Sequence, residues 1–145
     1  MSRALHSLLC DGAAFGSMEH QIEEALLSNG HYVTDALDVQ QRLNWQRALR
    51  LLDVAGVATT SYLDRCKIYC WDAEEAPRGM YSSEEIKVNV RQLAEFGEVL
   101  GTLIHELAHR ADRDGTVNHR EAMAVAWKQV VQCLAAHSGL NWLDC

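Results

Sequence analysis

The spacing of hydrophobic residues predicts two helices in the first part of the chain. A short helix is expected over Ser17–Leu27, because Asn29 and Gly30 follow it as stop signals. A stronger helix is expected over Asp38–Val54, where apolar residues form a broad face: Val39, Leu43, Ala48, Leu51 and Leu52. Residues 1–16 show little periodicity. We therefore interpret residues 1–30 as an N-terminal arm or helix, which could belong to a longer protein, and residues 31–145 as the main domain.

The pattern then changes to one typical of strands. Cys66–Trp71 is rich in aromatic and β-branched residues, which predicts a strand. A second, half-buried strand is expected where Ile86, Val88 and Val90 alternate with polar residues. The polar segment Asp72–Glu85 between them predicts a hairpin connection or a mobile flap.

Helical spacing returns in the last third of the chain. Leu93–Arg113 carries an apolar face and ends at Gly115, and Asn118–His137 forms a final helix that stops before Gly139. The order of helices and strands predicts an α+β domain in which a short, mostly antiparallel sheet packs on helices.

Length, charge and cysteine usage narrow the function classes. The chain has 145 residues, which fits one domain, and a net charge of −7 with no basic run. This balance argues against direct nucleic-acid binding and against an anionic membrane surface. No apolar stretch approaches the roughly 18 residues of a membrane span. The five cysteines lack the spacing of a disulfide framework, so we expect reduced thiols in a cytoplasmic protein of a prokaryote or phage.

The segment His105-Glu106-Leu107-Ala108-His109 is an HExxH motif inside a predicted helix. Residues four apart lie on one helix face, so the two imidazoles can bind one Zn²⁺ ion. Glu106 sits beside the first ligand and can take a proton from a water that zinc has acidified. This chemistry suits the hydrolysis of an amide bond.

A catalytic zinc usually takes three protein ligands, so a third must lie downstream. His119 and Glu121 are two residues apart on the last helix and cannot both face inward. The apolar face of that helix carries His119, which favours it, whereas Glu121 is the alternative and could instead serve a capping box with Asn118. Asp112 could orient an imidazole by a hydrogen bond to it without touching the metal, or could be a solvated charge. Asp114 is expected to belong to the turn that contains Gly115.

The stretch Gly101–Arg110 resembles the active helix of zincin metallopeptidases. The layout of the chain, and the nine residues between His109 and a late histidine that opens a helix, are similar to the minimal SprT-like peptidases. The resemblance implies a small zincin-like fold with His105, His109 and His119 as metal ligands and Glu106 as general base. It also implies that the strand with Ile86, Val88 and Val90 lies at the sheet edge and holds a peptide substrate by strand addition.

The sequence thus predicts a zinc-dependent peptidase that acts on a protein or peptide and leaves its oligomeric state open. Tyr81, in the polar connection, is the first candidate for a transition-state donor. One alternative is a non-catalytic metal-binding interaction domain, whose fourth ligand would be a residue such as Asp112 or Glu121. A domain without any metal is the second alternative.

Overall fold

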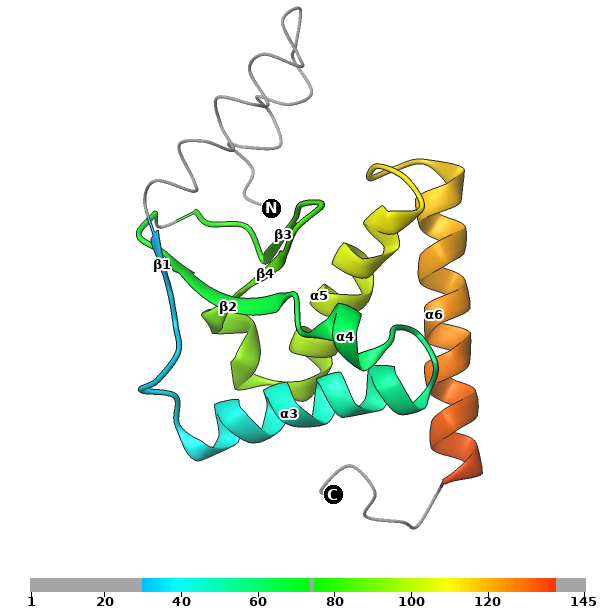
Figure 1. Cartoon of the computed structure of the whole chain (residues 1–145), viewed down its shortest axis with the longest axis horizontal. Helices are drawn as coiled ribbons and strands as arrows, with labels where there is room; N and C mark the ends of the chain where they lie inside the picture. Colours follow the sequence, from blue (N-terminus) through cyan, green and yellow to red (C-terminus); the bar gives the residue numbers. More distant parts are fainter. Residues whose placement is uncertain (1–29, 74, 138–145) are drawn as a thin grey trace, which may run out of the picture.

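The computed structural model describes residues 30–73 and 75–137, which fold into four strands and the helices around them (Figure 1). The predicted helix over Ser17–Leu27 and the arm up to residue 29 lie outside the described residues. In chain order the elements are β1 (Gly30–Tyr32), α3 (Val39–Val54), α4 (Thr60–Leu63), β2 (Cys66–Trp71), β3 (Gly79–Tyr81), β4 (Ile86–Asn89), η1 (Val90–Ala94), α5 (Phe96–Leu107), η2 (Ala108–Arg110) and α6 (Val117–Ala136).

Helix α3 begins at a complete capping box. The side chain of Asp38 accepts a hydrogen bond from the backbone N–H of Gln41 at 2.7 Å, and the Gln41 side chain accepts one from the Asp38 N–H at 3.0 Å. The helix buries Ala48, Leu51 and Leu52 against the rest of the core, as the hydrophobic pattern predicted, whereas Val39, which was expected on the same face, is exposed.

The sheet has the order β1-β2-β4-β3, and it is mixed. Strand β1 pairs antiparallel with β2, β2 pairs parallel with β4, and β3 pairs antiparallel with β4. The segment between β2 and β4 is therefore not a hairpin connection between these two strands, because they run parallel. It contains β3, a strand that the pattern did not predict, and β3 forms a hairpin with β4 through the turn at Ser82–Glu85, where Ser82 N–H donates to the Glu85 carbonyl at 2.9 Å. The prediction of a small α+β domain with a mostly antiparallel sheet is confirmed.

The expected edge position of the strand with Ile86, Val88 and Val90 is wrong. Strand β4 is paired on both sides, every one of its residues is buried, and Val90 already belongs to η1. Its polar residues are buried because each has a specific partner. The Lys87 ammonium lies 3.1 Å from the Glu85 carboxylate and over two tyrosine rings, and Asn89 donates to the Pro77 carbonyl at 3.0 Å.

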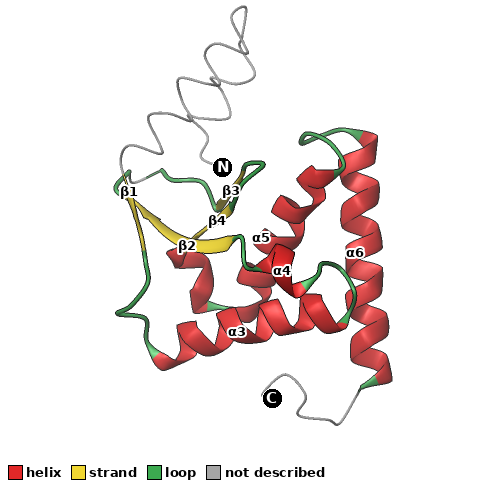
Figure 2. Ribbon diagram, in the orientation of Figure 1, coloured by secondary structure: helices red, strands yellow, loops and turns green. Residues whose placement is uncertain are grey.

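Helix α5 is the central element of the fold (Figure 2). It contacts β3 and β4 on one side and helices α3 and α6 on others, and Leu103, Ile104 and Leu107 are almost fully buried there. The helix predicted over Leu93–Arg113 is divided into η1, α5 and η2 because Glu95 adopts an extended conformation and the chain tightens after Leu107. The last turn of α5 is thereby placed beside the start of α6.

Candidate metal centre

The two histidines of the HExxH motif lie together at the end of the central helix. His105 and Glu106 belong to the last turn of α5, and His109 lies in η2, which continues the same helical path. The ring centroids of His105 and His109 are 5.3 Å apart. The predicted pairing of these two imidazoles on one face is present.

His119 joins this pair from the first turn of α6. Helix α6 begins after Thr116, whose hydroxyl accepts a hydrogen bond from the His119 N–H at 3.2 Å, and this cap turns the imidazole inward. Its side chain is only 2% exposed, and its ring centroid lies 4.8 Å from that of His105 and 4.5 Å from that of His109. The packed side of α6 thus carries His119 into the cluster.

Glu121, the alternative third ligand, is exposed and lies outside this cluster. The capping box proposed for it does not form, since Thr116 rather than Asn118 caps the helix.

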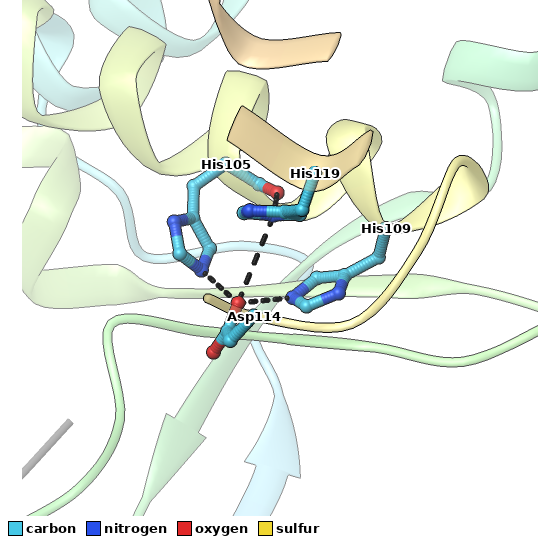
Figure 3. Close-up of side chains that lie close together, drawn as sticks. All are labelled: His105, His109, Asp114 and His119. Atoms are coloured by element: carbon cyan, nitrogen blue, oxygen red, sulfur yellow. Dashed lines mark hydrogen bonds and ion pairs between the residues drawn. The ribbon is translucent and has the colours of Figure 1, made fainter. Parts of the chain in front are cut away.

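A carboxylate that the sequence reasoning assigned to the turn completes the cluster (Figure 3). Asp114 Oδ1 lies 2.9 Å from His105 Nε2, 2.9 Å from His109 Nε2 and 3.7 Å from His119 Nε2. Asp114 also belongs to the expected turn, where Gly115 adopts a left-handed φ of 78°. Sequence spacing could not separate the two roles, because the direction of the carboxylate depends on how the turn returns the chain to α6.

These four residues could hold a metal ion, because their ligand atoms all lie within 4.8 Å of one another. A tetrahedral zinc ion with bonds of about 2.0–2.1 Å separates its ligand atoms by about 3.3 Å. The distances from Asp114 Oδ1 to the three Nε2 atoms bracket that value. Three imidazoles and a carboxylate are also ligand types that zinc accepts.

Two hydrogen bonds govern the protonation of the imidazoles. His109 Nδ1 lies 3.1 Å from the backbone carbonyl of Asp112, which requires the Nδ1 proton and leaves Nε2 free for a metal. His119 Nε2 lies 3.0 Å from the backbone carbonyl of His105, a contact in which Nε2 must carry the proton. Metal binding through His119 Nε2 would therefore replace that hydrogen bond.

Asp112 contacts the cluster differently from the prediction. Its backbone carbonyl orients His109, whereas its carboxylate accepts hydrogen bonds from the Arg113 N–H at 2.8 Å and from the Asn118 amide at 3.3 Å. The side chain therefore shapes the turn between η2 and α6.

Glu106 is buried beside the cluster. Its carboxylate Oε2 lies 3.8 Å from His109 Nε2, and its side chain is 9% exposed. Burial, and next the charge of Asp114, raise the pKa of Glu106 to about 8. Burial likewise lowers the pKa of His109. The hairpin strand β3 covers Glu106 so closely that a Cβ atom on Gly79 would lie 3.0 Å from Glu106 Cγ.

Tyr81 ends β3 next to the cluster. Its ring centroid lies 5.5 Å from that of His109. The pKa of Tyr62 is raised chiefly by burial and next by a hydrogen bond with the Tyr81 side chain. Arg110 stacks on Tyr62 at 4.7 Å from the ring centroid. The structure therefore brings Tyr81 within reach of the site.

No family model, curated protein or solved structure matches this chain. Within the described residues, none of the helices combines the length and the hydrophobicity that crossing a bilayer would require.

Proposed function

We propose that this protein is a zinc-dependent peptidase. One observation carries the proposal: three imidazoles from α5, η2 and α6 converge within reach of one ion, and the buried carboxylate of Glu106 lies 3.8 Å from one of them. Structural metal sites need the ligands but not a buried acid beside them. An acid in that place is what water-mediated hydrolysis requires.

In this proposal His105, His109 and His119 hold the metal. Zinc, when bound, supplies a Lewis acid that acidifies water and polarises a substrate carbonyl. Glu106 accepts a proton from the attacking water and returns it to the leaving amine. Burial raises the pKa of Glu106 to about 8 in the metal-free protein, and the positive charge of a bound ion nearby would favour the ionised carboxylate that accepts the proton. Tyr81 is the candidate donor to the oxyanion.

Strand β3 replaces β4 as the proposed substrate strand. It pairs with β4 along one edge, and among the described residues no strand pairs with its other edge. Gly79, on this strand, also lies against Glu106. An extended peptide added to β3 would run past the acid, so strand addition there would present a peptide bond to the site.

The test compares two glutamate variants from the same helix. Glu106→Gln removes the proposed base, and Glu98→Gln removes an exposed carboxylate paired with Arg78 at 3.8 Å. The readouts are zinc content by elemental mass spectrometry and cleavage of an unfolded protein such as casein. We expect both variants to keep about one zinc and only Glu106→Gln to lose cleavage, by at least about 100-fold. Equal cleavage by the parent and Glu106→Gln would remove Glu106 from the reaction.

The position of Asp114 favours a second candidate, a non-catalytic metal-binding interaction domain. With four protein ligands a metal site is closed and has no place for a substrate water. Such a domain would bind zinc tightly and cleave nothing, with or without Asp114.

A further inference from the structure

We propose that Asp114 is a displaceable fourth ligand that holds the peptidase site closed. This inference rests on the proposed function and adds a regulatory state to it. Its starting point is that Asp114 Oδ1 is equidistant, at 2.9 Å, from the Nε2 atoms of His105 and His109 (Figure 3). A water molecule that attacks a substrate would need the same fourth position.

The carboxylate differs from the imidazoles in how it is held. His105 and His119 are carried by the helices α5 and α6, and His109 by η2. Asp114 lies on the turn between η2 and α6, and its side chain is 50% exposed, compared with 2% for His119. Gly115, which follows it, has a φ of 78°, a conformation in which glycine is free and other residues are strained.

Withdrawal of Asp114 would leave the three-imidazole arrangement in place. The cap that positions His119 belongs to Thr116, whose hydroxyl also donates to the Arg113 carbonyl at 2.7 Å. Rotation of the Asp114 side chain about its Cα–Cβ bond breaks neither of these bonds. The site can thus change from a closed state, in which four protein residues bind the metal, to an open state with three histidine ligands and a free fourth coordination position.

A small monodentate anion tests this exchange without a substrate. The full chain is loaded with Co²⁺, whose visible absorption reports its ligands, and titrated with azide. The variants are Asp114→Ala, Asp114→Asn and, as the control, Asp64→Asn, which removes an exposed carboxylate at the end of α4. A parallel competition with a chelator measures the Kd for zinc.

We expect both Asp114 variants to bind azide at least about 10-fold more tightly than the parent, since no carboxylate competes. Their Kd for zinc should rise by at least about 10-fold, because metal affinity falls by that factor even when the mutated residue only hydrogen-bonds to a metal ligand. Asp64→Asn should match the parent in both. Casein cleavage should increase in Asp114→Ala.

Two results would overturn the inference. If Asp114→Ala and the parent bind azide and zinc equally, Asp114 is a turn residue only. If Asp114→Ala loses metal altogether while His119→Ala keeps it, Asp114 is a permanent third ligand. The first result leaves the proposed function intact when cleavage still depends on Glu106. The second leaves a peptidase in which Asp114 replaces His119 as a ligand, whereas a parent protein that binds no metal defeats the proposed function itself.

Discussion

Replacing Glu106 by glutamine should stabilise the metal-free protein, and the gain should grow as the pH rises. Glu106 is buried at the end of α5, and burial raises its pKa from an ordinary 4.5 to about 8. In the unfolded chain the carboxyl ionises near pH 4.5, whereas in the folded protein it holds its proton until about pH 8. Glutamine keeps the shape of the side chain and never ionises.

The sign and size follow from linkage between proton binding and folding. Between pH 4.5 and about 8 the unfolded state has released the proton that the folded state still binds, so each rise in pH favours unfolding. One pH unit in this window corresponds to about 1.4 kcal/mol. The contribution of Glu106 to the free energy of unfolding is thus fully present at low pH. It falls by on the order of 3 kcal/mol by pH 7, and the decrease levels off at about 5 kcal/mol above pH 8.

The assay is urea unfolding in the presence of a chelator at pH 5, 7 and 9. The free energy of unfolding of Glu106→Gln should exceed that of the parent by about 1 kcal/mol at pH 5 and by several kcal/mol at pH 9. His109 opposes this trend in both proteins, because its lowered pKa costs stability as the pH falls below its ordinary 6.5, so the difference between the two proteins isolates Glu106. Glu98→Gln should show no such dependence, since Glu98 is half exposed. A Glu106→Gln difference that stays constant from pH 5 to 9 would refute the reasoning.

Three further substitutions probe the supports of the site. Gly79→Ala should lower the stability of the folded protein by about 1–3 kcal/mol in a thermal melt, because the added Cβ would lie 2.9 Å from the Thr102 methyl group. Gly97→Ala is the control, since its added Cβ would meet open space, and it should not lower the stability. Equal effects of the two substitutions would contradict the close packing of β3. Asn44→Ala should cost about 1–3 kcal/mol in urea unfolding, because the buried amide donates to the Leu93 carbonyl at 2.8 Å; a loss below about 0.5 kcal/mol would argue against that bond. Tyr81→Phe should keep the zinc and lower the kcat for cleavage by about 100–1,000-fold if its hydroxyl stabilises the oxyanion; unchanged kcat would exclude that role.

The local features of this fold could be predicted from the sequence. Helix α3 and the His105–His109 pair depend on hydrophobic spacing and helical geometry within one segment, and both are where the pattern indicated. The preference for His119 over Glu121 also followed from a helix face, and the burial of His119 agrees with it.

Features that depend on distant partners could not be predicted in this way. The alternation of Lys87 with apolar residues indicated a half-buried strand, and the resemblance to zincins implied that this strand lies at the sheet edge. Instead, Tyr32 and Tyr69, from other strands, and Glu85 bury that lysine. The return of the chain through β3 then covers the outer side of β4. Asp114 was assigned to its turn because nothing local specifies the direction of a carboxylate.

The central claim is that His105, His109 and His119 together hold zinc, and elemental mass spectrometry of tag-free protein tests it most directly. The parent and Glu121→Ala should each contain about one zinc per chain, because Glu121 is exposed and lies outside the cluster. His119→Ala should lose it, since the remaining imidazoles lack their third partner. Zinc retained by His119→Ala and lost by Glu121→Ala, or no zinc in the parent after reconstitution, would contradict the account.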